Sequence, residues 1–145
     1  MVSEEPPAPR SVFDVVDDRP LRVERGRCAV GRVEDLPPGS RGIFTSIGMA
    51  GRGIGVFNVA GRFYAVRNQC PHRGAPVCYG RLRPHVTGPE VHAVAFEREG
   101  EVLKCPWHQW EFDLATGESL YAPGVRLKTY PVVVEDGQIV IVLSP

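Results

Sequence analysis

Two short stretches are the most informative part of this chain: Cys70-Pro71-His72-Arg73-Gly74 and Cys105-Pro106-Trp107-His108. Each brings a cysteine and a histidine together in a tight loop that contains a proline. Two thiolates supply soft ligands and two imidazoles supply borderline nitrogen ligands, a donor set that suits a mixed iron–sulfur cluster or zinc. Two such loops can hold a small metal centre from opposite sides. The predicted metal ligands are therefore Cys70, His72, Cys105 and His108.

With their flanks, 70–76 and 105–113, the two stretches resemble the Rieske family, most closely the small ferredoxin components of ring-hydroxylating oxygenase systems. In such proteins two histidines replace two cysteines on one iron of a [2Fe–2S] cluster. The resemblance implies that Cys70 and Cys105 bind the inner iron. It implies equally that His72 and His108 bind the outer iron, near the surface.

The ligand set also has consequences for the redox potential. Two ferric ions and two sulfides carry a charge of plus two, so two thiolates make the oxidised site neutral, whereas four would leave a dianion. A neutral site accepts an electron more easily, and Rieske centres span roughly −150 to +300 mV, against about −400 mV for all-cysteine plant-type clusters.

Two departures from the high-potential members of the family favour the low end of that range. Those members place a serine two residues and a tyrosine four residues after the second histidine, where their hydroxyls donate to cluster sulfurs. Trp110 and Phe112 stand at these positions and carry no hydroxyl. Those members also brace the loops with a disulfide, at positions occupied here by Ala75 and Trp107. We expect a low-potential cluster.

The motif has three other interpretations. Two cysteines and two histidines also form zinc sites, but zinc fingers usually pair Cys with Cys and His with His, whereas both units here are mixed. A relative that keeps the fold and loses the cluster is disfavoured because all four ligands are present. A disulfide scaffold is disfavoured in a chain of this length without a signal peptide.

Four further residues with metal-binding side chains are not expected to be ligands. Cys28 and Cys78 lack a histidine at ligand spacing, and buried, unreactive thiols are the usual state of such residues. His85 and His92 lack a cysteine partner and are interpreted as surface or strand residues.

Composition limits the classes of partner. Lys and Arg number 17, as do Asp and Glu, so the net charge is zero and no nucleic-acid or membrane footprint is indicated. No apolar run approaches the length of a membrane span. The acidic, proline-rich start lacks the basic and apolar regions of a signal peptide. We expect a cytoplasmic protein.

Strand signals dominate the chain and helix signals are nearly absent. The family resemblance covers 28–142 and implies an all-β fold, a Rieske-type antiparallel β-sandwich base of two stacked sheets with an inserted cluster-binding subdomain at 69–121. We expect residues 1–26 to form a flexible arm and 27–145 to form the Rieske domain. The predicted strands are 29–33, 42–47, a hairpin of 54–59 and 62–67 across Ala60-Gly61, and a hairpin of 129–134 and 138–142 across Asp136-Gly137.

The segment between the two ligand loops is longer than is typical of the resembling ferredoxins. Alternating apolar residues predict a hairpin of 91–96 with 101–104, and 81–90 is the predicted insertion, with either a role in partner choice or none. Pro123 falls where the family has a third, proline-containing loop over the cluster.

The chain is too short to add the catalytic domain of a terminal oxygenase, so it is not expected to be an enzyme by itself. The leading hypothesis is a one-electron carrier between a flavin-dependent reductase and an oxygenase. Its partner surface would surround the outer ligands, with Arg73, Arg81 and Arg83 either steering an acidic partner or only keeping the surface soluble. Two alternatives share the same site: the small subunit of an NAD(P)H-dependent reductase resembling nitrite reductase, and a redox-sensing module.

Overall fold

The computed structural model describes residues 15–48, 52–71, 74–83, 102–106, 110–122 and 124–144. These residues form three sheets and two single 3-10 turns, η1 (Val33–Asp35) and η2 (Val77–Tyr79). The strands are β1 (Val15–Asp17), β2 (Arg27–Arg32), β3 (Arg41–Phe44), β4 (Ile54–Val59), β5 (Arg62–Arg67), β6 (Arg81–Arg83), β7 (Val102–Lys104), β8 (Glu111–Asp113), β9 (Thr129–Tyr130), β10 (Val132–Glu135) and β11 (Gln138–Val142).

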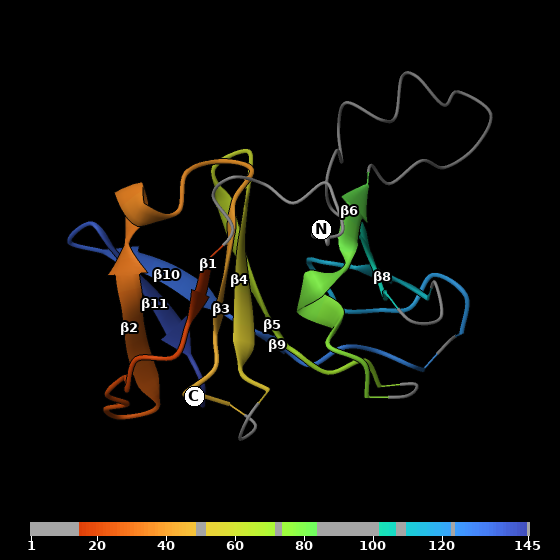
Figure 1. The fold of residues 1–145 in the computed structure, drawn as a ribbon, viewed down its shortest axis with the longest axis horizontal. Coiled ribbons are helices and arrows are strands. Elements are labelled where there is room, and N and C mark those ends of the chain that lie inside the picture. The colour runs from red at the N-terminus through yellow and green to blue at the C-terminus, as the bar shows by residue number, and fades with distance from the viewer. Residues whose placement is uncertain are drawn as a thin grey trace, which may run out of the picture.

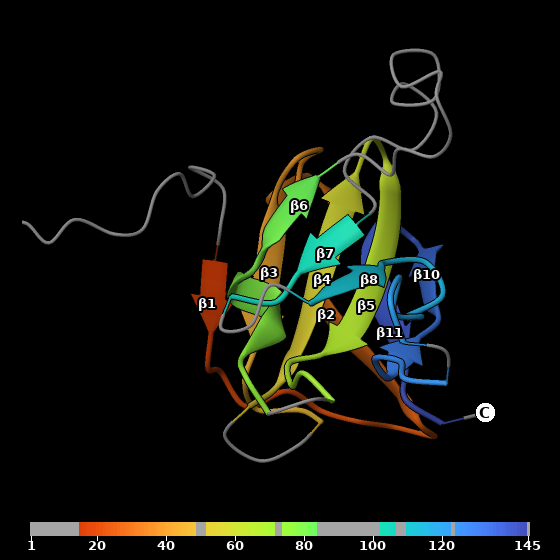
Figure 2. The same ribbon diagram turned by 90° about the vertical axis from the view of Figure 1, so that its right-hand side faces the viewer.

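A five-stranded central sheet of order β1-β3-β4-β5-β9 lies between the two other sheets (Figure 1). The outer sheet, β10-β11-β2, lies on one side of it, and the small sheet, β6-β7-β8, covers β4 and β5 on the other, as Figure 2 shows. All six residues of β4 are buried, as expected of a strand with neighbours on both faces. The expected all-β sandwich with an added subdomain is confirmed.

Alternation along β4 divides the interior into two cores. Ile54 and Val56 pack toward the outer sheet, with residues such as Cys28 and Ile139. Phe57 and Val59 pack toward the small sheet and the two loop cysteines. Because successive side chains of a strand point to opposite faces, one strand supplies both cores.

Two of the three predicted hairpins are present, and local backbone chemistry explains their turns. In the second, the predicted strand 129–134 is divided at Pro131 into β9, which pairs with β5, and β10, which pairs with β11. Ala60 and Gly61 have φ values of 54° and 92°, and β4 pairs antiparallel with β5 around them. Asp136 and Gly137 have φ values of 53° and 75° between β10 and β11. Positive φ at both central residues is the type I′ geometry that matches the twist of hairpin strands.

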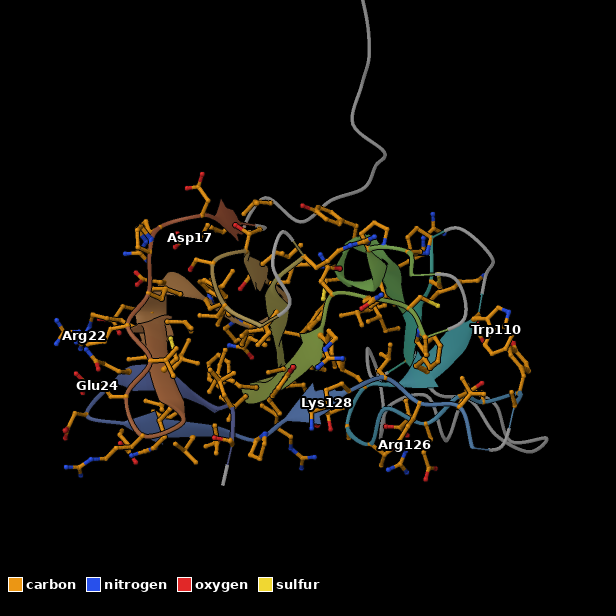
Figure 3. All side chains as sticks on the ribbon, turned by 90° about the horizontal axis from the view of Figure 1, so that it is seen from below. Asp17, Arg22, Glu24, Trp110, Arg126 and Lys128 are labelled. Atoms are coloured by element: carbon orange, nitrogen blue, oxygen red, sulfur yellow. The ribbon has the colours of Figure 1, made fainter. Side chains whose placement is uncertain are left out.

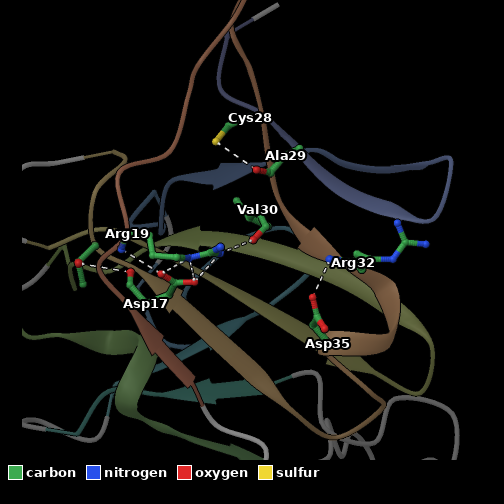
Figure 4. Close-up of polar contacts among 8 residues, drawn as sticks. Asp17, Arg19, Cys28, Ala29, Val30, Arg32 and Asp35 are labelled. Atoms are coloured by element: carbon green, nitrogen blue, oxygen red, sulfur yellow. Dashed lines mark hydrogen bonds and ion pairs between the residues drawn. The ribbon is translucent and has the colours of Figure 1, made fainter.

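Strand β1 lies within the predicted arm and pairs parallel with β3 at the edge of the central sheet. Its end is fixed by an ion pair of 2.7 Å between Asp17 and Arg19, whose guanidinium also donates to the Val30 carbonyl (Figure 4). This contact ties β1 to β2 of the outer sheet. The parallel pairing is an addition to the expected antiparallel architecture.

The small sheet corrects the predicted organisation of the segment between the ligand loops. Strand β7 pairs antiparallel with β6 on one side and with β8 on the other. The partner of 102–104 is therefore β6, which sequence analysis assigned to the 81–90 insertion. The predicted partner, 91–96, and the remainder of the insertion lie outside the described residues. The small sheet needs 81–83 because β7 would otherwise have an unpaired edge.

No helix in the part of the chain that the structure describes is long and apolar enough to cross a membrane.

Candidate metal centre

The two predicted cysteine ligands lie at the ends of two strands and share one core. Cys70 comes shortly after β5, and Cys105 comes directly after β7. Their exposed fractions are 1% and 0%, and both belong to the core between the central and small sheets. Sequence positions 35 residues apart are thus brought together by the packing of the small sheet on the central one.

The two loops close in the same way. The Cys70 amide donates to the Ala75 carbonyl at 2.8 Å, and the Cys105 amide donates to the Trp110 carbonyl at 2.7 Å. In both loops a cysteine N–H therefore bonds the carbonyl five residues later, and the predicted histidine lies inside the closed segment. The first loop has a further closure, from the Gly74 amide to the Cys70 carbonyl at 2.7 Å.

The histidine ligands themselves, His72 and His108, lie outside the described residues. The same holds for Pro123, for Arg73 of the predicted partner surface, and for the four-ligand arrangement as a whole. The assignment of the four ligands therefore stays a prediction.

A model of the Rieske [2Fe-2S] domain matches residues 26–131 of the chain. The chain belongs to the Rieske [2Fe-2S] family. Its cofactor is one [2Fe–2S] cluster, and the function of the domain is to carry single electrons. A [2Fe–2S] cluster thus takes the place of zinc in the interpretation of the motif.

Relatives of this Rieske domain include ferredoxins of two aromatic dioxygenase systems. The ferredoxin component of the naphthalene 1,2-dioxygenase system of Pseudomonas putida is 35% identical over 95 residues, 65% of this chain and 76% of that protein. The 3-phenylpropionate/cinnamic acid dioxygenase ferredoxin subunit of Photorhabdus laumondii is 37% identical over 92 residues, 63% and 73% of the two chains. A chain in the complex of reduced oxygenase and oxidised ferredoxin of carbazole 1,9a-dioxygenase shares the fold, with a TM-score of 0.62, 22% identity and coverage of 82% and 94%.

The surroundings of the two cysteines fit a cluster of low net charge. Their core neighbours are apolar, among them Val77, Leu103 and Phe112, each 0% exposed. Bare thiolates in such surroundings would be strongly destabilised. The net charge of plus two on two ferric ions and two sulfides would offset both thiolates, so the donors and the apolar core suit the cofactor of the family.

The second loop has the aromatic residues that sequence analysis associated with a low potential. Phe112 is fully buried, and its ring stacks on that of Trp110 at 6.4 Å between centroids. Ala75 is also fully buried and closes the first loop through its carbonyl instead of through a disulfide. Trp110 lies at the end of the molecule farthest from Arg22 and Glu24 (Figure 3).

A buried carboxylate beside the second loop was missed by sequence analysis. Glu111 on β8 is 4% exposed, and its Oε1 accepts a hydrogen bond of 2.7 Å from the Tyr121 hydroxyl. The Ser119 hydroxyl accepts the amides of Tyr121 and Ala122 at 3.1 and 3.0 Å. These bonds fix the chain just before Pro123. The Glu111–Tyr121 spacing offered no sequence signal, because the contact depends on how two loops fold.

Arg41 was also missed, although it connects the central sheet to the metal-binding half. Its guanidinium donates to the carbonyls of Cys78 and Gly80 at 2.8 and 2.5 Å and lies over the Phe57 ring, 5.0 Å from its centroid. It therefore fixes the chain between η2 and β6. The partners lie 37 and 39 residues away, so no local pattern could indicate the contact.

The two remaining cysteines are buried, as predicted. Cys28 and Cys78 are both 0% exposed, and none of the four cysteines forms a disulfide. Burial raises the pKa of Cys28, and burial raises the pKa of Cys78 to about 12, against the weaker lowering influences of a hydrogen bond near Gly55 and the charge of Arg41. Both thiols are therefore protonated at neutral pH and poor nucleophiles.

Proposed function

We propose that this Rieske domain is the ferredoxin of an aromatic-ring dioxygenase system, accepting single electrons from a flavin-dependent reductase and delivering them to an oxygenase. The cluster would be held by Cys70, His72, Cys105 and His108. The observation that carries the proposal is the pair of equally closed loops, each with a buried cysteine, in a chain whose named relatives are dioxygenase ferredoxins.

When bound, the cluster supplies one site that takes up and releases a single electron. The residues of the chain prepare that site in two ways. The apolar core around Cys70 and Cys105 excludes water from the cysteine side. The backbone closures of the two loops hold both cysteines before any partner arrives, which limits the rearrangement that accompanies electron transfer.

A low potential is part of the proposal, and the second loop supports it. Hydroxyl donors to cluster sulfurs stabilise the reduced, more negative state and raise the potential. At the two positions concerned, Phe112 is buried in the core and Trp110 stacks on it, and neither side chain carries a hydroxyl. A low potential suits a carrier that receives electrons from a reduced flavin.

The partner surface is proposed at the end of the molecule that carries Trp110. Tyr121, whose hydroxyl bonds Glu111 next to Trp110, is 66% exposed, and Tyr79 of η2 is 43% exposed. Aromatic side chains with a polar tip are frequent in transient interfaces. The proposed ligands His72 and His108 would belong to this surface, and the bound cluster would supply the electron that is exchanged there.

The first experiment determines iron and sulfide in anaerobically purified protein and records its EPR spectrum after dithionite reduction. The second mixes the protein with NADH, naphthalene and the reductase and oxygenase components of a naphthalene 1,2-dioxygenase system, and measures naphthalene-dependent oxygen uptake. We expect two irons, a Rieske-type signal and oxygen uptake that depends on this chain. The Cys105→Ser variant, with an altered cluster, is the negative control.

Zinc in place of iron would end the electron-transfer proposal. Copurification of a large NAD(P)H-dependent subunit, together with failure to support oxygen uptake, would favour the reductase-subunit alternative. A cluster that neither component reduces or oxidises would favour the redox-sensing module.

A further inference from the structure

We propose that Arg52 and Asn68 are positioning residues for the first cluster loop: together they fix both ends of the segment 74–78, to which Cys70 is hydrogen-bonded. The inference rests on the proposed role of Cys70 as a cluster ligand. It is independent of which reductase or oxygenase the domain serves.

Arg52 fixes the first end of the segment. Its guanidinium donates a hydrogen bond of 2.6 Å to the Gly74 carbonyl, 22 residues away. The amide of the same Gly74 donates to the Cys70 carbonyl at 2.7 Å, and the Cys70 amide donates to Ala75 at 2.8 Å. One side chain from outside the loop therefore holds the residue that closes it, and a displacement of Gly74 is passed directly to the backbone of Cys70.

Asn68 fixes the second end. Its Oδ1 accepts the Cys78 amide at 2.8 Å, and its Nδ2 donates to the Arg52 carbonyl at 3.0 Å. The Asn68 side chain is 3% exposed, so both of its polar atoms are used inside the protein. Since Asn68 stands two positions before Cys70, the same residue fixes the entry to the loop and the segment that follows it.

The two positioning residues are joined to each other and to the central sheet. Besides the side-chain bond to Arg52, the Asn68 amide donates to the Gly53 carbonyl at 3.0 Å. Gly53 has a φ of 85°, and a Cβ there would lie 2.4 Å from the Phe44 carbonyl oxygen of β3. The turn before β4 therefore packs against the backbone of β3 and gives the two side chains a fixed base.

The expected consequence is a change in the cluster and not only in stability. Partners outside the ligand set orient the ligands, and their loss typically costs about 10- to 100-fold in metal affinity. Arg52 and Asn68 hydrogen-bond directly to the backbone of Gly74 and Cys78, and neither is among the residues proposed for the partner surface. Their loss should therefore alter cluster retention, EPR signal and potential without a change in partner recognition.

The chain contains a matched control in Asn58. This asparagine is also 3% exposed, donates from Nδ2 to a carbonyl, that of Leu36, at 2.7 Å, and accepts an amide, that of Gly61, at 2.8 Å. None of these side-chain partners belongs to the Cys70 loop. Asn58→Ala and Asn68→Ala thus each remove one donated and one accepted side-chain hydrogen bond, from equally buried positions.

The experiment compares holoproteins carrying Asn68→Ala, Asn58→Ala, Arg52→Met and Arg52→Lys. It measures the rate of cluster loss to a chelator, the reduced EPR spectrum, the midpoint potential and amide hydrogen exchange in the peptide 69–80. We expect cluster loss to accelerate at least about tenfold in Asn68→Ala and Arg52→Met. We expect Arg52→Lys, which keeps a donor, to recover most of the retention, and Asn58→Ala to keep the wild-type spectrum and potential while losing thermal stability.

Equal spectra, potentials and loop exchange in Asn68→Ala and Asn58→Ala would overturn the proposal and leave Asn68 an ordinary buried amide. If Asn68→Ala does not fold, the Arg52→Met and Arg52→Lys pair carries the test, and wild-type behaviour in both would overturn it. Should Cys70→Ser leave the cluster intact, the ligand assignment fails, whereas amide exchange in 69–80 still reports whether Arg52 and Asn68 hold the loop.

Discussion

Gly80→Ala should loosen the junction between the two ligand loops. Gly80 ends η2 with a φ of −73° and a ψ of 174°, a conformation that alanine adopts without strain. A Cβ at this position, however, would lie 1.9 Å from the Lys104 carbonyl oxygen and 3.0 Å from that of Val77. Lys104 directly precedes Cys105, so the added methyl group acts on the backbone of the second ligand loop.

The size of the effect follows from that overlap. Real Cβ contacts are essentially never shorter than 3.0 Å, so the start of β6 and the end of β7 must separate by about 1.1 Å, the difference between 3.0 and 1.9 Å. Overpacking of a close-packed interior costs about 1–3 kcal/mol, and sometimes more where backbone must move. We expect a loss of unfolding free energy of about 2–3 kcal/mol and a faster loss of the cluster.

Gly31→Ala in β2 is the control. Its φ is not positive, and its Cβ would approach only the Asp35 carboxylate, at an ordinary 3.5 Å. Alanine also leaves the unfolded chain fewer conformations than glycine does, which raises the free energy of unfolding of the Gly31→Ala variant by up to about 1 kcal/mol. Thermal unfolding monitored by circular dichroism and by cluster absorbance compares the two. A Gly80→Ala protein as stable and as well loaded with iron as Gly31→Ala would refute the steric reasoning.

Three further results are expected. Phe112→Tyr introduces a hydroxyl in the buried second loop, and a bond to the cluster worth about 1.4 kcal/mol more in the reduced state raises the midpoint potential by about 60 mV for one electron. An unchanged potential in a redox titration of the loaded variant contradicts this, and the control is Phe63→Tyr in β5, which packs against the other core. The folded Cys78 thiol, with its pKa raised to about 12, holds its proton more tightly than the unfolded chain. The contribution of Cys78 to the free energy of unfolding is therefore full below about pH 8.5. It declines by up to about 1.4 kcal/mol per pH unit as the pH rises toward the folded pKa. The difference in thermal midpoint between wild type and Cys78→Ala should therefore narrow between pH 8 and 11. Removal of iron with a chelator should increase amide exchange in β7 and β8 long before β2 and β11; uniform loss of protection would argue against a separate second core.

The hairpins show what the sequence can predict reliably. The turns Ala60-Gly61 and Asp136-Gly137 both have glycine at the second central position, where positive φ carries no steric cost, and the flanking strands are rich in apolar residues. These signals lie within a few residues of one another, so local chemistry is sufficient. The burial of Cys28 and Cys78 follows in the same way, from the general behaviour of thiols that lack a metal-binding partner.

The small sheet and the long-range arginine contacts around the first loop show where prediction from the sequence fails. Strand β6 is only three residues long, with arginine at both ends, and sequence analysis interpreted it as insertion. Its identity as a strand comes from pairing with β7, about twenty residues later in the chain. The contacts of Arg41 and Arg52 likewise join residues 22 to 39 positions apart. Such partners are fixed by tertiary packing, which a single sequence does not encode in any periodic pattern.

The division of the interior into two cores explains how one small domain can bury the two cysteines that are proposed as cluster ligands. Among the described residues, the core between the central and outer sheets contains none from either cysteine loop. Its hydrophobic burial is therefore present whether or not a cluster is bound. The other core includes Cys70 and Cys105 among apolar neighbours, where charged sulfur is stable only when bonded to metal. Strand β4 contributes side chains to both cores. The packing between the central and outer sheets therefore also stabilises the strand against which Cys70 and Cys105 pack.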